Sequence, residues 1–278
     1  MKINKIIIFF LPIILSNFLI LDCTSGSGRR KEQSESRDSL IRELEFGRLL
    51  SEKIIQKYPV LQDEKATLYV SKVGKAVALF AGRSDIEYHF AILDSETINA
   101  FAAPGGYVFV TKGALAKMKT EAELAAVLAH EIGHINNKHI LKELPPPRET
   151  GGIVNTLAAL LVAQGTVVSS AFTEVVNQAS EMLFSKGYKK EDEYDADKSA
   201  VFYTAETGYT PRGLFDFVKR MKDFQEKDRK AVVYNTHPSP TERLERIKKL
   251  IETEKFNLKK PDAEDRFDKE IGRLKKGS

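Results

Sequence analysis

Apolar residues recur along this chain with a helical period in most segments and with a strand period in one short region. The helical spacing, with apolar residues three or four positions apart, predicts a mainly helical protein. The expected helices cover residues 39–58, 64–80, 121–141 and 189–206, and another begins at Pro240. Alternating β-branched and aromatic residues predict short strands at 87–93, 97–102 and 107–111. The pattern therefore predicts an α+β fold with a small sheet.

The last two predicted strands are separated by Pro104-Gly105-Gly106, which predicts a hairpin and hence an antiparallel sheet. One of these strands contains Asn99, Ala100 and Phe101. A strand at the edge of a sheet binds an extended peptide by backbone pairing, which would make this segment a substrate-binding strand. An ordinary hairpin explains the same residues equally well.

Two predicted helices begin with a capping box, in which a Ser or Thr is followed three residues later by Glu. Thr120 with Glu123 starts one of them, and Ser239 with Glu242 starts the other. Pro240 suits the first position of the second helix because its fixed backbone angle is already helical.

The first 22 residues have the composition of an export signal. Lys2 and Lys5 precede an apolar run over residues 6–21, which is a little short for a membrane span. The run leads into Cys23, the only cysteine of the chain. A cysteine in this place is typical of a lipidated bacterial lipoprotein, although the two residues before it are larger than usual. An uncleaved membrane anchor or simple cleavage is the alternative.

Composition divides the remainder into a tether, a domain and a tail. Residues 23–38 are rich in serine, glycine and charge, which predicts a flexible tether. Residues 39–252 carry the periodic elements, and residues 253–278 form a charged tail that we expect to contribute little to the core. Within the domain, residues 151–173 hold no charge. Buried helices or a helix over the active site are favoured there, with a membrane-inserted segment as the alternative.

Charge excludes one class of partner. The chain has 278 residues, 42% of them hydrophobic, and its 43 basic and 39 acidic residues leave a net charge of only +4. No basic stripe interleaved with aromatic residues is present in the sequence. We therefore expect one globular domain with a sizeable core and no nucleic-acid partner.

The stretch His130-Glu131-Ile132-Gly133-His134 carries the strongest chemical signal. In a helix, His130 and His134 are one turn apart on the same side, which suits them to bind a metal ion together. Glu131 follows at about 100° around the helix from His130 and can take a proton from a metal-bound water. This HExxH pattern predicts a zinc hydrolase in which Glu131 is the general base.

A zinc site of this kind needs a third protein ligand and an open position for water. The acidic helix over residues 189–206 offers two pairs with i, i+4 spacing, Glu191 with Asp195 and Glu193 with Asp197. The second pair shares a face with small apolar residues that would pack inward, so Glu193 is the better ligand. Asp197 could then accept the second N–H of a liganding histidine. A solvated acidic face is the alternative.

Two further histidines are candidates for the same site. His139 lies five residues after His134, but the surrounding residues do not match a three-histidine pattern, so we expect a structural role. His237 precedes Pro238 just ahead of the predicted helix at Pro240. From that loop it could donate a hydrogen bond to a developing oxyanion, or it could be an ordinary loop histidine.

Taken together, these motifs resemble the zinc endopeptidases of metallopeptidase family forty-eight. The resemblance rests on four stretches that occur in the family's order over about residues 40–252. They are Asn99-Ala100-Phe101 with Pro104-Gly105-Gly106, His130 to His134 with His139, Glu193-Tyr194-Asp195-Ala196-Asp197, and His237-Pro238-Ser239-Pro240 with Arg243. HExxH alone is moderately specific, whereas the ordered set is strongly specific.

The resemblance implies a zincin-like (gluzincin) domain with one Zn²⁺ held by His130, His134 and Glu193, and with Glu131 as general base. Exported bacterial members of the family act in the cell envelope on misfolded or stalled proteins. It therefore implies a periplasm-facing endopeptidase that cuts unfolded or extended polypeptides and is bound to the membrane through its N-terminal lipid. The alternative function is a zinc-binding envelope lipoprotein that acts as a chaperone or adhesin and cuts little.

Overall fold

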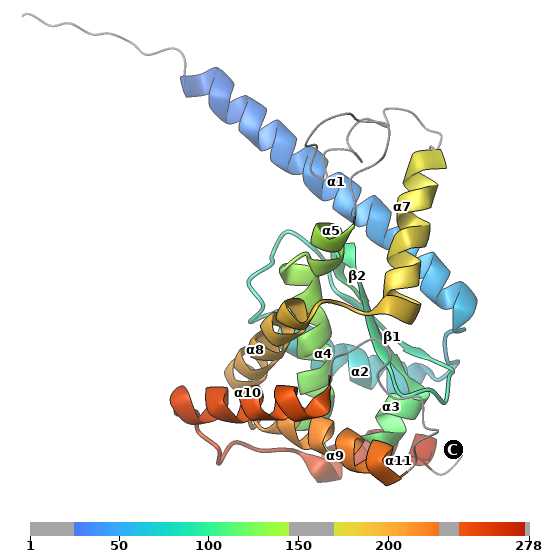
Figure 1. Ribbon diagram of the computed structural model, residues 1–278, viewed down its shortest axis with the longest axis vertical. Coiled ribbons are helices and arrows are strands. Elements are labelled where there is room, and N and C mark those ends of the chain that lie inside the picture. Colours follow the sequence, from blue (N-terminus) through green and yellow to red (C-terminus); the bar gives the residue numbers. More distant parts are fainter. Residues whose placement is uncertain (1–24, 145–169, 228–238, 276–278) are drawn as a thin grey trace, which may run out of the picture. The chain divides into compact units, whose positions relative to one another are not determined.

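Figure 1 shows the protein as a computed structural model, in which residues 25–144, 170–227 and 239–275 are described. The predictions for the leader, for Cys23, for His237 and for nearly all of the uncharged segment 151–173 lie outside these residues. The chain divides into two compact units, Met1–Arg37 and Asp38–Ser278. All the side chains discussed below belong to the second unit.

Helices make up most of the described part of the chain. The longer ones are α1 (Ser25–Lys57), α2 (Glu64–Ala78), α4 (Glu121–Asn136), α7 (Ser170–Glu181), α8 (Lys190–Glu206), α9 (Gly213–Lys227), α10 (Pro240–Thr253) and α11 (Glu264–Lys275). Shorter ones are α3 (Lys112–Lys117), α5 (His139–Glu143) and the π-helical turn η2 (Met182–Lys186). Among the described residues, no helix combines the length and the apolar composition needed to cross a membrane.

Helix α1 begins at Ser25, so the described part of the predicted flexible tether is helical instead. Half of residues 25–38 are arginine, lysine, glutamate or glutamine, and all four have high helix propensity. The absence of apolar periodicity pointed to an irregular conformation, but propensity and continuity with the helix that follows favour the helical one.

The sheet has three strands in the order β1-β3-β2, with β1 at His89–Leu93, β2 at Ala100–Ala103 and β3 at Tyr107–Thr111. Strands β2 and β3 form the predicted antiparallel hairpin around the turn Pro104–Gly106, where Gly105 has a φ of 77°. Strand β1, however, pairs with β3 in parallel. The prediction of a purely antiparallel sheet is therefore wrong, because no tight turn joins β1 to β2 and β1 can pair on the far side of β3.

Helix α4 ends earlier than predicted. It stops at Asn136 rather than at Leu141, and Lys138 adopts a left-handed conformation with a φ of 53° before α5 begins at His139. The side chain of Asn136 donates a hydrogen bond of 2.7 Å to the carbonyl of Ala81, and the ammonium of Lys138 lies 2.9 Å from the buried carboxylate of Glu43. These contacts stabilise the break, which the apolar pattern alone does not reveal.

The centre of the second unit is α4, whose residues from Glu121 to Ile135 are all buried. The helix lies between the sheet and α8 and also packs against α2 and α9 (Figure 1). A helix buried on all sides must be apolar or have its polar groups paired inside the protein. The histidines and glutamates of α4 therefore need internal partners.

The C-terminal segment contributes to the core, contrary to the prediction for residues 253–278. Helix α11 packs against α2, α3 and α4, and its Phe267 and Ile271 are fully buried. Three apolar residues mark the buried face, Phe267, Ile271 and Leu274, spaced i, i+4, i+7 among many charged ones. The charged residues around this stripe dominate the composition of the segment, and composition alone therefore suggested a solvated tail.

A buried carboxylate links α11 to the first turn of α4. Glu121 accepts hydrogen bonds from the Tyr69 hydroxyl at 2.6 Å, from Arg266 Nε at 2.5 Å and from the Tyr209 hydroxyl. Burial alone would raise the pKa of Glu121, but Arg266 and the two tyrosines outweigh burial and lower it below the ordinary value of 4.5. Glu121 is therefore ionised in the folded protein, at a helix N-terminus that favours negative charge.

We expect Glu121→Gln to lower the free energy of unfolding by about 1–3 kcal/mol at pH 7, because it leaves buried donors poorly satisfied. A carboxylate with a lowered pKa stabilises the fold above its unfolded pKa, and this contribution is lost as the pH falls through its folded pKa. The gap between wild type and variant should therefore shrink below about pH 4.5 in urea denaturation. The exposed Glu264→Gln on α11 is the control. A gap that stays constant down to about pH 3 would contradict the assignment.

Candidate metal centre

The start of α4 is fixed by the predicted cap. The Thr120 hydroxyl accepts a hydrogen bond of 3.2 Å from the Glu123 amide. The Glu123 carboxylate accepts a hydrogen bond from the Lys119 amide, one residue earlier than the amide that a capping box uses. It also accepts a hydrogen bond of 2.7 Å from Arg220. At α10, Ser239 occupies the N-cap position without the predicted side-chain hydrogen bond, and the carboxylate of Glu242 pairs with Lys190.

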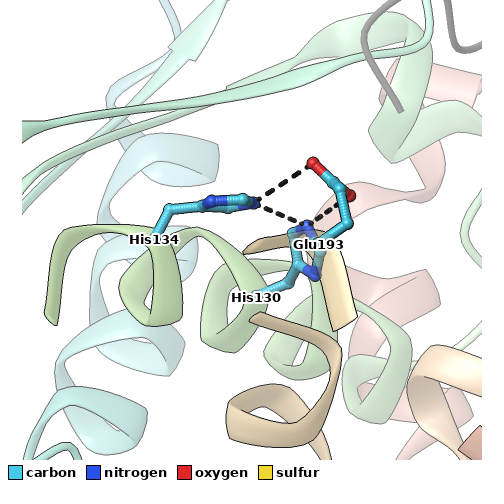
Figure 2. Close-up of side chains that lie close together, drawn as sticks. All are labelled: His130, His134 and Glu193. Atoms are coloured by element: carbon cyan, nitrogen blue, oxygen red, sulfur yellow. Dashed lines mark hydrogen bonds and ion pairs between the residues drawn. The ribbon is translucent and has the colours of Figure 1, made fainter. Parts of the chain in front are cut away.

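Two histidines of α4 and one glutamate of α8 point toward one another (Figure 2). The Nε2 atoms of His130 and His134 lie 3.1 Å apart. Glu193 Oε2 lies 3.6 Å from His130 Nε2, and Glu193 Oε1 lies 3.5 Å from His134 Nε2. All three side chains are buried. The structure therefore brings together the three residues predicted to be metal ligands.

These separations suit a tetrahedral zinc ion. Two ligand atoms at about 2.05 Å from zinc, at the tetrahedral angle, are roughly 3.3 Å apart. The observed separations of 3.1, 3.5 and 3.6 Å lie close to that value. Two imidazole nitrogens and one carboxylate oxygen are also a common donor set in catalytic zinc sites, where they leave a fourth position for water. Both the geometry and the chemistry of the residues present therefore fit this ion.

The carboxylate reaches the histidines because α8 packs very closely on α4 at Gly133. A Cβ atom on Gly133 would lie 2.9 Å from the Ser199 Cβ and 3.2 Å from the Ala196 Cα. The facing residues Ala196 and Ala200 are fully buried, as their small size predicts, whereas Glu191 on the other side of α8 is exposed. The choice of Glu193 over Glu191 from the sequence agrees with this packing.

Asp197 occupies the position predicted for it behind His130. Its Oδ1 lies 2.9 Å from His130 Nδ1, so the Nε2 side of the ring faces Glu193 and His134. Arg243 donates two hydrogen bonds to the same carboxylate, of 2.9 Å from Nε and 2.7 Å from Nη2. Burial raises the pKa of Asp197, but Arg243 and His130 outweigh it and hold that pKa below its ordinary value. An ionised Asp197 fixes the orientation of the imidazole.

The number of protons bound at the site would change if a cation bound there. Burial lowers the pKa of His130, but the hydrogen bonds to Asp197 and Glu193 more than offset it and raise the pKa to about 9. His130 therefore holds a proton at neutral pH when no cation is bound. Because a metal ion can bind only to a deprotonated nitrogen, metal binding at this site must release that proton.

His139 supports the second histidine instead of joining the ligand set. Its Nδ1 lies 2.9 Å from His134 Nδ1, because the break at Lys138 turns the chain back toward the site. Burial lowers the pKa of His139, so its neutral ring can accept the N–H of His134. The ring of Tyr188 stacks on His134 with centroids 4.2 Å apart and an interplanar angle of 18°. These two neighbours leave His134 little rotational freedom.

The residues of the predicted substrate strand divide between the two faces of the sheet. Asn99, Ala100 and Glu131 line the same cavity as His130, so the predicted substrate strand adjoins the predicted general base and His130. The side chain of Phe101 points to the opposite face of the sheet, where it stacks on Tyr58 at 5.5 Å. Alternation along a strand separates Phe101 from its neighbours in this way. The structure therefore does not bring the Phe101 ring into the site.

Sequence reasoning missed the roles of Arg243 and Tyr188, and it expected a structural role for His139 without identifying His134 as its partner. Of these residues, only Arg243 has a position in the sequence that could have indicated its role. It is spaced i, i+4, i+8 with Ile247 and Ile251, which are buried in the core. The neighbouring Leu244 is only half-buried. An arginine on the apolar stripe of a helix indicates a buried anionic partner, since an unpaired buried charge is too costly.

The fold and the site define a class of protein. A mainly helical domain with an HExxH helix beside a small sheet, and a buried glutamate from a second helix, is a zincin-like metallopeptidase architecture. Residues 64–251 match Peptidase family M48, and the chain belongs to this family. Membership implies a metal ion at the cluster of His130, His134 and Glu193.

Several curated proteins are similar over the same region. The beta-barrel assembly-enhancing protease of Escherichia coli K12 is 24% identical over 211 residues, covering 74% of this chain and 43% of the relative. The mitochondrial metalloendopeptidase OMA1 of Schizosaccharomyces pombe is 31% identical over 190 residues, covering 66% of this chain and 53% of the relative. The metalloprotease LoiP of E. coli K12 is 25% identical over 160 residues, covering 58% and 61%. This chain thus spans about half the length of the curated relatives it matches.

We expect Asp197→Asn to weaken zinc binding by about 10- to 100-fold, because the amide holds the His130 ring less well and adds no charge. Competition with a zinc-sensitive dye measures the affinity. Glu191→Gln, an equivalent change on an exposed position of α8, is the matched control and should leave the affinity unchanged. Equal affinities for wild type and Asp197→Asn would show that the carboxylate does not support the ligand.

Proposed function

We propose that the protein is a zinc endopeptidase of the bacterial cell envelope that hydrolyses peptide bonds in unfolded or extended polypeptides. The observation that carries the proposal is that His130, His134 and Glu193 lie together at separations that suit zinc. Glu131 directly follows His130 in the sequence. Membership of a peptidase family and relatives named as proteases support the same reaction class.

The chemistry follows from the arrangement of this chain's own groups. Zinc, when bound, supplies a Lewis acid that lowers the pKa of a water molecule and polarises a carbonyl group. His130, His134 and Glu193 would hold the ion, while Asp197 and His139 keep the two imidazoles in the required orientation. Glu131 is buried beside His130 and would take the proton from the attacking water. The same carboxyl group would then deliver that proton to the leaving amine.

We assign substrate binding to β2, one of the two edge strands of the sheet. Strand β2 pairs with β3 on one side and borders the cavity that contains Glu131. A polypeptide that adds to β2 through backbone hydrogen bonds would bring a peptide bond to Glu131 with little regard to sequence. Binding of this kind requires an extended chain, which supports unfolded or unassembled proteins as the substrate class. His237 is proposed to stabilise the oxyanion, on the strength of its place in the family motif.

The proposed location rests on the N-terminus. A charged and apolar leader followed by Cys23 favours export and attachment to the membrane through a lipid on that cysteine. A relative named for its part in beta-barrel assembly agrees with substrates among envelope proteins. Labelling of cells with a radioactive fatty acid, for wild type and Cys23→Ser, tests the anchor. Label on wild type alone supports it, and equal labelling contradicts it.

We expect Glu131→Gln to keep its zinc and to lower the rate of peptide hydrolysis by at least about 100-fold, because glutamine cannot accept the water proton. Metal content by mass spectrometry and digestion of reduced, unfolded casein measure the two quantities. Glu143→Gln, which alters a carboxylate on the neighbouring helix α5, is the control for a nonspecific effect of charge.

The same variant separates the protease from the alternative of a zinc-binding chaperone or adhesin. If the protein is a protease, the wild type cuts the casein and the Glu131→Gln variant leaves it intact. A chaperone binds casein equally in both forms and cuts it in neither. Removal of zinc with a chelator should abolish cutting by wild type, and addition of zinc should restore it. Cutting that persists in Glu131→Gln would refute the assignment of the base.

A further inference from the structure

A carboxylate of α1 is buried beside the break that ends α4. Glu43 is 0% exposed, and its oxygens lie 2.9 Å from Lys138 Nζ and 3.1 Å from Arg83 Nη1. A buried carboxylate needs cationic partners, because an unpaired charge is costly to remove from water. Arg83 has a second partner in Asp85, at 2.7 Å. The contact between Glu43 and Lys138 therefore ties the end of α4 to α1.

The backbone at Lys138 is strained. Its φ of 53° lies in the left-handed region, where the Cβ atom of an L-residue crowds the following carbonyl oxygen. Glycine, or sometimes asparagine, normally occupies such a position just after the C-terminus of a helix. Here a lysine adopts this conformation while its ammonium contacts the buried carboxylate of Glu43. The ion pair thus offsets the strain of the backbone.

The apolar pattern favours a different conformation, in which the helix of the two histidines continues to Leu141. In a continuous helix His139 would follow His134 by five residues, which is a net rotation of about 140° around the axis. The two imidazoles would then lie on different sides of the helix. The break instead brings His139 Nδ1 to 2.9 Å from His134 Nδ1. The contact between the two rings therefore depends on the break.

We propose that Glu43 is a positioning residue of the metal centre. Through Lys138 it holds the left-handed break, and the break keeps His139 against His134, the proposed zinc ligand. The Nε2 atom of His134 faces Glu193 at 3.5 Å, so Nδ1 is the atom that a supporting partner must hold. Loss of the partner behind a liganding histidine weakens metal binding. The inference rests on the zinc centre of the proposed function and not on the cutting of peptides.

The first test compares two substitutions of Lys138, whose side chain is 38% exposed. Lys138→Met and Lys138→Gly both remove the ammonium, but only glycine adopts the left-handed conformation without steric crowding. We expect Lys138→Met to weaken zinc binding by the full chain about tenfold, and Lys138→Gly to stay within about twofold of wild type. Competition with a zinc-sensitive dye measures both affinities. Equal affinities for the two variants would overturn the proposal.

The second test removes the other half of the ion pair. Glu43→Gln should weaken zinc binding about tenfold in the wild-type background. In a Lys138→Gly background it should have little effect, because the backbone no longer needs the ion pair. In a His139→Ala background it should also have little effect, because the contact through which Glu43 acts is already lost. Such non-additivity identifies residues that act through one another, and an equal loss in all three backgrounds would contradict it.

A spectroscopic readout follows the contact between the rings directly. Isotopic labelling of the histidine ring nitrogens lets NMR spectroscopy detect the His134 Nδ1–H in the zinc-loaded protein, and His139→Ala identifies its signal. This proton should exchange slowly with water in wild type and in Lys138→Gly. In Lys138→Met and Glu43→Gln the exchange should be at least about tenfold faster, because the proton is no longer held by His139. Unchanged exchange in these two variants would overturn the proposal.

Two other carboxylates serve as matched controls. Glu45→Gln changes an exposed carboxylate on α1 and should alter neither readout. Glu121→Gln changes a similarly buried carboxylate at the other end of α4, and should lower stability in urea without altering zinc affinity. If its zinc affinity falls as far as that of Glu43→Gln, the effect of Glu43 is one of stability alone and the proposal is overturned. The two Lys138 variants decide the matter if Glu43→Gln does not fold.

Failure of this proposal can be told apart from failure of the proposed function. Wild type that binds zinc but leaves casein intact refutes the endopeptidase function, while the zinc affinities and the N–H exchange still decide the role of Glu43. Unchanged zinc affinity in Lys138→Met and Glu43→Gln overturns the positioning role and leaves the endopeptidase intact. Wild type that binds no zinc refutes both.

Discussion

The close contact between α4 and α8 at Gly133 is the constraint on which the metal centre depends. The two histidines come from one helix and are placed by its period alone, but Glu193, the third residue of the cluster, comes from a helix far away in sequence. Any side chain at Gly133 would meet Ser199 and Ala196 at 2.9 and 3.2 Å and push the helices apart. Zinc ligands tolerate errors of only about 0.2 Å in distance, so even a small separation would remove Glu193 from the site.

The charges buried around this contact explain why the site suits a cation. Glu131, Glu193 and Asp197 are at most 4% exposed, and Arg243, at 3%, supplies one compensating positive charge. Burial of unpaired charge costs several kcal/mol per ion, on the order of magnitude of the whole stability of a domain. In the absence of metal, the proton on His130 reduces this excess of negative charge, since its pKa is raised to about 9. A divalent ion replaces that proton and neutralises one charge more.

The clustering of His130, His134 and Glu193 could be predicted from the sequence because the position of each residue depends on a local pattern. HExxH fixes two side chains by helical spacing, and the small residues beside Glu193 identify the inward face of α8. The partners of these ligands could not be predicted, because they depend on tertiary contacts. His139 reaches His134 only through the left-handed break at Lys138, and the parallel pairing of β1 follows from a chain crossing that leaves no local signal. Arg243 is the exception, since its place on an apolar stripe can be read.

The same contacts explain how a central helix can carry so many polar groups and remain rigid. At the N-terminal end of α4, Glu121 is held by α2 and α11 through Tyr69 and Arg266. At the C-terminal end, Lys138 is held by Glu43. Catalytic groups must be kept within roughly 0.5 Å of a productive position, which elements fixed at both ends achieve better than loops. Contacts at both ends therefore hold His130, Glu131 and His134 in place along the middle of α4.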